Sequence, residues 1–259
     1  MSSKSATFRF YAELNDLLPR PRRFVDFVHE FQGTPSVKDV IESLGVPHTE
    51  VEVILVHGAP QGFGYRLQDG DRVSVYPMFE ALDVGEGARV RTWPLRQPRF
   101  VLDVHLGKLA AYLRLLGFDA AYDRQMQDPE LARLSASEQR ILLTRDRQLL
   151  KRSQVTHAHL VRSLEPTVQC VEVVRRFDLA GLAAPFTRCL RCNAKLRGVE
   201  VGDFAERVPA WVQAEAGEVT RCDACDRLYW RGTHYDRLES LARDILETAR
   251  GAAASRETM

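Results

Sequence analysis

Two Cys-x-x-Cys pairs constrain the fold of this chain more than any other feature of its sequence. Cys189 and Cys192 form the first pair, Cys222 and Cys225 form the second, and 29 residues lie between the pairs. Each short turn presents two thiolates, and two such turns brought together give the tetrahedral set of sulfurs that zinc prefers. Because four thiolates leave no open position for water or substrate, the spacing predicts a structural Zn²⁺ that stabilises a small ribbon.

The composition favours a reducing compartment and argues against a membrane. The 259 residues include five cysteines, of which Cys170 alone stands outside the pairs, and this pattern favours metal binding over disulfides. The N-terminus has no apolar signal sequence and no apolar run is long enough to span a membrane, so we expect a cytoplasmic protein. The formal net charge is +1, so a basic surface for nucleic acid would have to be local.

The first segment, residues 5–85, has the pattern of a small β-grasp, or ubiquitin-like, domain. Alternating apolar and polar residues in ATFRFYAEL predict a strand, and PRRFVDFVHEF predicts a second one. SVKDVIESLGV predicts a short helix with Ser36 as its N-cap, and two more strands follow in VEVILVHG and QDGDRVSVYP. We expect this domain to bind a protein partner or to restrict a neighbouring site. EGARVRTWPLRQP, which comes next, predicts either a linker or an arm that lies on the following domain.

The second segment, residues 98–185, alternates short apolar strands with helices, which predicts an α/β domain built on a parallel sheet. RFVLDV and RILLTRD are strand patterns that end in Asp103 and Asp146, and HLGKLAAYLRLLG between them has leucines at helical spacing. The third segment, residues 186–250, holds the cysteine pairs and then a charged amphipathic helix. The predicted architecture is therefore a β-grasp domain, a parallel-sheet domain, and a zinc ribbon with a C-terminal helix.

Three aspartates are candidate ligands for a second metal. Asp103 and Asp146 each end a predicted strand, and Asp128 opens the helix between them. The carboxyl ends of parallel strands meet at one edge of a sheet, and clustered carboxylates there suit Mg²⁺ or Mn²⁺, which can activate water against a phosphodiester. Aspartate is also a favoured N-cap, so each residue has a purely structural interpretation as well. That interpretation is strongest for Asp128, because Pro129 follows it.

Four basic residues near these acids are candidate contacts to a nucleic-acid backbone. Lys108 and Arg114 follow Asp103 on the predicted helix after the first strand. Arg145 and Arg147 flank Asp146. Lysine and arginine on a helix face are also commonly just solvated, so each of the four has this alternative interpretation.

Three longer motifs resemble a known family. LGKLAAYLRLLGFD, LLTRDRQLL and YWRGTH occur in the order found in the RNase domain of the Mut-seven C-terminal family, which is similar to PIN-domain nucleases and carries a zinc ribbon. Many bacterial members have a ubiquitin-like domain in front, as residues 5–85 suggest here. The resemblance implies hydrolysis of single-stranded RNA at a PIN-like site that binds one or two divalent metals, with Asp103, Asp128 and Asp146 as the matching acids.

The sequence thus predicts a metal-dependent ribonuclease with structural Zn²⁺ and catalytic Mg²⁺ or Mn²⁺. A PIN-like site usually has a fourth acid, for which Glu138 and Glu165 are both candidates. The unplaced fourth acid favours one alternative, a non-catalytic RNA-binding adaptor that keeps the fold without a working metal site. A second alternative is a ubiquitin-like scaffold for protein assembly.

Overall fold

The chain folds into two compact units that do not simply follow one another along the sequence. The described residues of the computed structural model are 3–77, 98–214 and 218–254. One unit consists of residues 1–96 and 146–160, and the other of residues 97–145 and 161–259. The sequence predicted consecutive domains instead. The predicted linker, apart from its last residue Pro98, and the predicted end of the β-grasp domain at residue 85 lie outside the described residues.

The first unit contains a five-stranded sheet in the order β2-β1-β5-β3-β4. β1 and β5 are parallel, whereas β1 with β2, β3 with β5 and β3 with β4 are antiparallel. The strands are β1 Lys4–Phe10, β2 Phe27–Phe31, β3 Val51–Val56, β4 Ala59–Gln61 and β5 Arg72–Pro77. Helix α1, Val37–Ser43, begins where the Ser36 side chain accepts a hydrogen bond from the Asp39 amide. The predicted β-grasp order is confirmed, and β4 is an addition to it.

Residues 146–160 belong to this first unit although they follow β8 in the chain. They form helix α4, Arg147–Leu150, and strand β9, Ala158–Leu160. Lys151 Nζ donates to the carbonyl of Glu42 at 2.8 Å, and the Leu160 amide donates to the Glu50 carboxylate at 2.7 Å. Because Glu50 is only 1% exposed, this last bond lies inside the unit.

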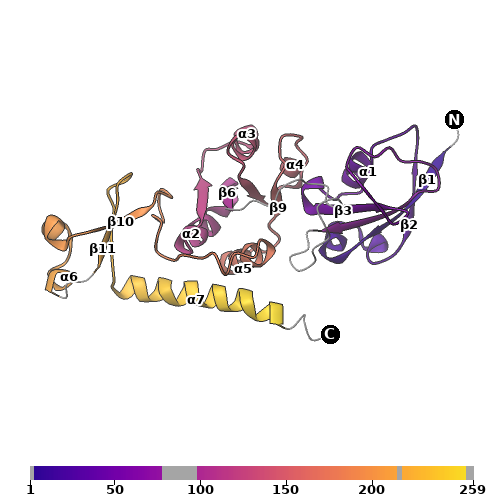
Figure 1. The fold of residues 1–259 in the computed structure, drawn as a ribbon. Coiled ribbons are helices and arrows are strands. Elements are labelled where there is room, and N and C mark those ends of the chain that lie inside the picture. Colours follow the sequence, from indigo (N-terminus) through magenta and orange to yellow (C-terminus); the bar gives the residue numbers. More distant parts are fainter. Residues whose placement is uncertain (1–2, 78–97, 215–217, 255–259) are drawn as a thin grey trace. The chain divides into compact units, whose positions relative to one another are not determined.

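The second unit is built around three parallel strands in the order β7-β6-β8, which confirms the predicted parallel α/β domain. The strands are β6 Arg99–Leu102, β7 Asp119–Tyr122 and β8 Ile141–Thr144. Helix α2 follows β6, helix α3 follows β7, and helix α5 comes later in the chain (Figure 1); they span Gly107–Leu115, Asp128–Glu138 and Pro166–Arg176. Every residue of β8 is buried, as expected of a parallel strand whose two faces are both covered.

The cysteine-containing region of the second unit folds as a small antiparallel ribbon, β10-β11-β12. Its strands and short helix are β10 Leu196–Val199, β11 Val219–Cys222, β12 Leu228–Trp230 and α6 Ala210–Ala214. Val208, Val212 and Val219 form its buried core. Three buried valines make a small core, so the ribbon needs another source of stability.

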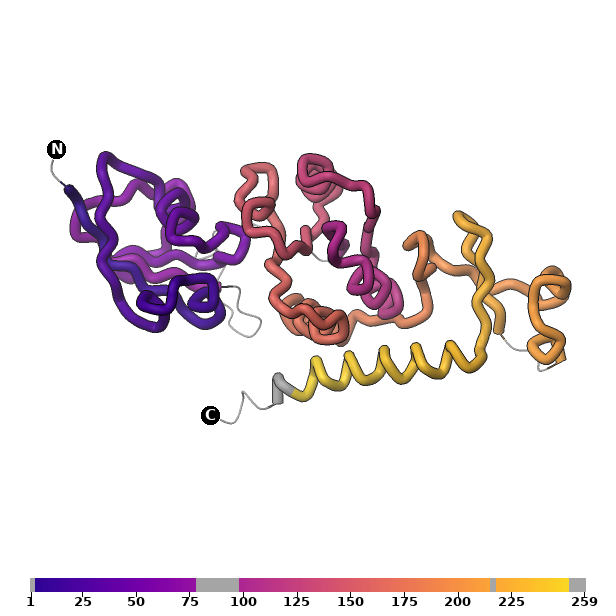
Figure 2. The backbone as a smooth tube through the Cα atoms, turned by 180° about the vertical axis from the view of Figure 1, so that it is seen from behind, coloured from indigo at the N-terminus to yellow at the C-terminus, as the bar shows by residue number. Residues whose placement is uncertain are grey.

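Helix α7, Thr233–Ala254, leaves the ribbon and runs along α5 (Figures 1 and 2). Arg175 Nε donates to the carbonyl of Ala249 at 3.3 Å, and Arg250 donates to the carbonyl of Ala180 at 3.0 Å. No helix in the described parts of the chain combines the length and apolar character of a membrane span. The 3₁₀ helices are η1 Ala12–Leu17, η2 Arg20–Arg22, η3 His48–Glu50, η5 Val104–Leu106 and η6 Val201–Arg207.

Candidate metal centre and acidic strand ends

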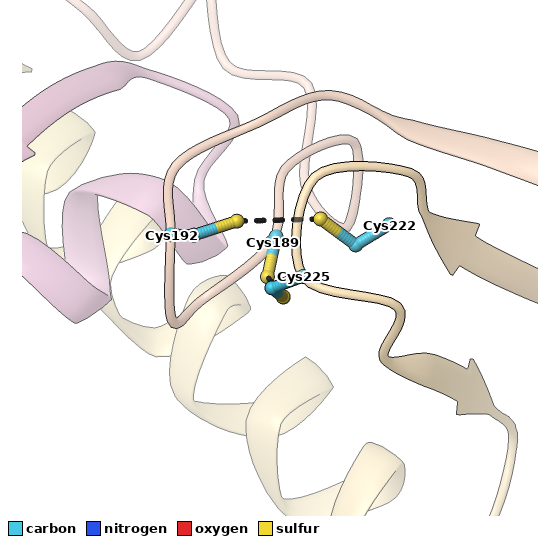
Figure 3. Close-up of side chains that lie close together, drawn as sticks. All are labelled: Cys189, Cys192, Cys222 and Cys225. Atoms are coloured by element: carbon cyan, nitrogen blue, oxygen red, sulfur yellow. Dashed lines mark hydrogen bonds between the residues drawn. The ribbon is translucent and has the colours of Figure 1, made fainter.

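The four paired cysteines converge on one point of the second unit (Figure 3). Cys189 Sγ lies 3.5 Å from Cys225 Sγ, and Cys192 Sγ lies 3.3 Å from Cys222 Sγ, so the close contacts join one turn to the other. All four sulfurs lie within 4.8 Å of one another. Sulfurs bound to one tetrahedral zinc at about 2.3 Å are about 3.8 Å apart, so this donor set fits the ion.

The two turns that carry the cysteines have the same backbone geometry. In the first, the Asn193 amide donates to the carbonyl of Cys189 at 3.0 Å, and in the second the Asp226 amide donates to that of Cys222 at 2.8 Å. Asn193 and Asp226 both adopt left-handed conformations, with φ of 72° and 58°. Asparagine and aspartate tolerate this conformation better than most residues, so the position after each pair suits a tight metal-binding turn.

The thiol of Cys189 ionises more readily than an ordinary cysteine. Burial alone would raise its pKa, but the Tyr229 hydroxyl at 3.1 Å and backbone amides outweigh burial and lower the pKa to about 6. By contrast, burial is the largest cause that raises the pKa of Cys192 to about 12. One sulfur of the set is therefore readily available as a thiolate, and metal binding has to displace protons from others.

Arg114 joins the first cysteine turn to the parallel sheet. Its guanidinium donates to the carbonyls of Leu190 at 3.1 Å, Arg191 at 2.8 Å and Ala120 at 2.9 Å. The predicted contact of Arg114 with RNA is wrong, because this residue is only 4% exposed and its donors point into the protein. Its positive charge instead lies close enough to Cys189 to interact with it.

Asn193 ties the same turn to β7. Its side-chain oxygen accepts a hydrogen bond from the Ala120 amide at 2.9 Å, and its nitrogen donates to the Asp119 carboxylate at 2.8 Å. An amide at the edge of the sheet is thus satisfied by a ribbon side chain. The metal-binding turn is consequently part of the packing of the α/β domain.

Asp103 occupies the carboxyl end of β6 and is 6% exposed. Its carboxylate accepts hydrogen bonds from the His105 amide at 2.7 Å, from the Arg145 amide at 3.2 Å and from the hydroxyl of Thr144. The first bond makes Asp103 the N-cap of η5. The other two come from the residue that ends β8 and its neighbour, so two strand ends meet at this carboxylate.

The other two predicted acids differ from Asp103 in their surroundings. Asp146, one residue beyond Arg145, is exposed and caps α4 by accepting a hydrogen bond from the Gln148 amide at 2.7 Å. Asp128 is the first residue of α3 rather than its N-cap, which is Gln127. The cap predicted at Asp128 is therefore wrong by one residue. Within the described ranges, the four cysteines are the one set of three or more such side chains at metal-binding spacing, and the aspartates form no second set.

The two candidates for a fourth acid lie in different places. Glu138 accepts hydrogen bonds from Arg99 at 3.0 Å and from Arg140 at 2.7 Å. Arg99 is the first residue of β6, and Arg140 directly precedes β8. Glu138 therefore lies at the amino ends of the strands, away from Asp103. Glu165 caps α5 through the Val168 amide, and this bond, with a smaller contribution from the charge of Lys108, lowers its pKa. Glu165 stays a candidate for the fourth acid, whereas Glu138 lies at the opposite ends of the strands.

Three of the four predicted basic contacts are exposed: Lys108, Arg145 and Arg147. Arg147 also donates to the carbonyl of Leu17 at 3.4 Å, within the first unit. Contact between these three side chains and RNA stays a prediction.

Two family models match the chain. One is described as the Mut7-C RNAse domain and covers residues 98–242, and the other is described as Mut7-C ubiquitin and covers residues 3–83. The chain belongs to the Mut7-C RNase-domain family. A comparison with curated proteins finds no match. The Mut7-C match indicates a nuclease-type function for the α/β domain and ribbon, and the ubiquitin-like match indicates protein interaction for the N-terminal region.

Three contacts of the Mut7-C domain site were not predicted from the sequence. Thr144 holds Asp103, Asn193 holds the first cysteine turn, and the Tyr229 hydroxyl contacts Cys189. Asn193 had a detectable signal, because it follows Cys192 as Asp226 follows Cys225. The roles of Thr144 and Tyr229 depend on contacts across the fold, which no local pattern encodes.

Proposed function

We propose that the Mut7-C domain of this chain is a divalent-metal-dependent ribonuclease that hydrolyses the phosphodiester bonds of single-stranded RNA. Asp103, Asp128 and Asp146 are its proposed ligands for Mg²⁺ or Mn²⁺, and Zn²⁺ is the proposed ion of the four cysteines. The observation that carries the proposal is the buried Asp103 carboxylate where two parallel strands end, within a domain that matches an RNase family. Ligands of open parallel sheets bind at this edge.

The hydrogen bonds of Asp103 leave its carboxylate able to bind a metal ion as well. Its three hydrogen bonds use part of the roughly four acceptor positions of a carboxylate, so at least one lone pair stays available. The Thr144 hydroxyl fixes the orientation of that carboxylate. A divalent cation bound there would supply an acidified water and stabilise charge on the phosphate and leaving oxygen. Lys108 and Arg145, both exposed, are the proposed contacts that hold the RNA backbone.

The test is cleavage of labelled single-stranded RNA by zinc-loaded protein, with added Mn²⁺, with Mg²⁺ and without either. We expect metal-dependent cleavage that Asp103→Asn and Asp146→Asn each reduce by at least about 100-fold, the order of loss when a transition-state contact is removed. Glu130→Gln is the matched control, since Glu130 is an exposed acid in the first turn of α3. Activity that survives in both asparagine variants at the level of Glu130→Gln would refute the assigned site.

A non-catalytic RNA-binding adaptor is the second candidate function. Two observations favour it: the three aspartates form no close ligand set, and Asp103 and Asp146 already act as helix caps. Calorimetric titration of zinc-loaded protein with Mn²⁺ separates the two functions. The nuclease requires that Mn²⁺ bind at a site other than the zinc site and that Asp103→Asn weaken this Mn²⁺ binding. The adaptor requires RNA binding without any such Mn²⁺ site.

A ubiquitin-like scaffold for protein assembly is the third candidate, and the ubiquitin-like match supports it. Strand β2 lies at the edge of the first unit's sheet, where Val28 is 63% exposed. Recovery of a stable protein partner, with no bound RNA, would favour the scaffold over both RNA-directed functions.

A further inference from the structure

An aromatic cavity in the second unit lies apart from the acidic strand ends. It has a volume of about 510 Å³ and is bounded by the loop before the first cysteine, by α6, by β12 and by the first turn of α7. This volume falls within the range of about 300–1,000 Å³ that ligand pockets span. Its aromatic lining residues are Phe186, Trp211, Tyr229, Trp230 and Tyr235.

Ordinary packing of the ribbon accounts for two of these aromatic residues. Trp230 packs against the valine core of the ribbon, and the Tyr229 hydroxyl contacts Cys189. Trp211 differs, because this large apolar residue is 46% exposed. A Cβ added to Gly232 would lie 3.2 Å from the Trp211 ring, so the absence of a side chain there lets the indole lie close to the backbone.

Another part of the cavity lining is a pair of stacked rings with a cation over one of them. The rings of Phe186 and Tyr235 stack with centroids 4.3 Å apart, and the Arg231 guanidinium lies 5.1 Å from the centroid of Tyr235. Phe186 has φ of 62°, a left-handed conformation that costs a bulky residue about 1–2 kcal/mol. This conformation is maintained at the cavity wall, as strained residues at binding sites often are.

The charges of the lining favour an anionic ligand. Among the described residues that line the cavity, Arg188, Arg231 and His234 occur together with one acid, Glu218. Arg188 already donates to the carbonyls of Gly117 and Asn193, so Arg231 is the better placed cation for a ligand. An exposed indole and a guanidinium that line one cavity suit a nucleobase and its phosphate, because bases stack on aromatic faces whatever their sequence.

We infer that this cavity is a nucleotide-binding subsite for single-stranded RNA, in which a base stacks on Trp211 and the adjoining phosphate contacts Arg231. The inference rests on the proposed ribonuclease function for the choice of RNA as ligand. It adds a contact outside the acidic strand ends that binds the RNA without taking part in its hydrolysis.

The test measures binding rather than cleavage, so it stays informative if the protein cleaves nothing. The probe is a short oligouridine that contains 2-aminopurine, whose fluorescence falls when it stacks, added to zinc-loaded full-length Asp103→Asn protein. Trp211→Ala should weaken binding about tenfold and remove the fluorescence loss, since one stacked base contributes about 1–3 kcal/mol. Trp211→Phe should keep most of both, and Phe24→Ala should change neither, because Phe24 is an exposed aromatic residue of the first unit.

A second variant tests the phosphate contact separately. Arg231→Gln should weaken binding and lower the slope of log Kd against log salt by about 0.7, the value for one phosphate contact to a single strand. Zinc content and thermal melting verify the fold of each variant. Should Trp211→Ala fail to fold, the result for Arg231→Gln decides the test. Binding by Trp211→Ala within twofold of its parent, or equal displacement of the RNA by polyglutamate without any stacking signal, would overturn the inference.

Discussion

A single buried arginine does much to connect the metal-binding turn to the α/β domain. The Arg114 guanidinium satisfies one carbonyl of β7 and two carbonyls of the Cys189–Cys192 turn. Buried carbonyls without donors are costly, and the arginine would be costly if it were buried without them. The side chain and the turn therefore stabilise each other.

Replacement of this arginine by methionine should weaken both the fold and the metal site. We expect Arg114→Met to lower the free energy of unfolding by about 3 kcal/mol, because three carbonyls lose a donor. Zinc should also pass more readily to a chromogenic chelator. Urea denaturation and chelator competition measure the two effects. Arg191→Met is the matched control, since the side chain of Arg191 is exposed, and equal behaviour of the two variants would contradict the assigned role.

At this scale the sequence predicted the metal site better than the acidic site. Cysteine spacing is a local property, so all four cysteines were found, and they do converge. Arg114 was misassigned as an RNA contact, although its neighbours Leu113 and Leu115 suggested a buried helix face. The choice between Glu138 and Glu165 required the strand ends to be placed in space. No spacing along the chain could supply that.

Among the elements, the amino ends of the parallel strands are held by a charge network opposite the acidic edge. Asp119, at the start of β7, accepts hydrogen bonds from Arg140 at 2.6 Å and Asn193 at 2.8 Å. Arg140 also donates to Glu138 at 2.7 Å. The network thus joins β7, β8 and the first cysteine turn through one carboxylate.

The contribution of Asp119 should depend on pH. Burial would raise its pKa, but the bonds from Arg140 and Asn193 outweigh burial and lower the pKa below its ordinary value. A lowered folded-state pKa gives stability that is complete above the unfolded value and is lost as the pH falls through the folded value. We expect Asp119→Asn to cost about 3 kcal/mol at neutral pH, and the difference to shrink below about pH 4. Urea titrations across this range measure it, and a difference independent of pH would contradict the prediction.

The order of the larger elements could be predicted from sequence, and the small ones could not. The α/β alternation and the β-grasp order followed from periodicity, which reports burial directly. Strand β4 was missed because three residues that include Pro60 carry no periodic signal. Helix α6 has five residues and one buried side chain, Val212, so its sequence resembles that of a loop.

On the scale of the whole molecule, the first compact unit includes part of the region that matches the Mut7-C RNase domain. Residues 146–160 lie within the matched range 98–242 yet fold with the ubiquitin-like residues. His48 contacts the carbonyl of Val155 at 3.0 Å, and Glu50 accepts the Leu160 amide at 2.7 Å. The ubiquitin-like region therefore holds the segment that begins with Asp146.

Loss of one of these hydrogen bonds should lower the local stability of residues 158–160 in the RNase region. Glu50→Ala removes the acceptor of the Leu160 amide from a buried position, so we expect faster hydrogen exchange in residues 158–160. Exchange followed by mass spectrometry measures this change. Glu30→Ala is the control, because Glu30 is exposed on β2, and equal protection of residues 158–160 in both variants would contradict the proposed support.

The shared segment has a consequence for any attempt to produce the two matched regions as separate fragments. A cut between the two matched regions would separate hydrogen-bonding partners of the first compact unit into two fragments. Residues 146–160 would belong to the RNase-domain fragment. Their hydrogen-bonding partners Glu42, His48 and Glu50 would belong to the ubiquitin-like fragment. Fragments made separately should therefore recombine without a covalent link.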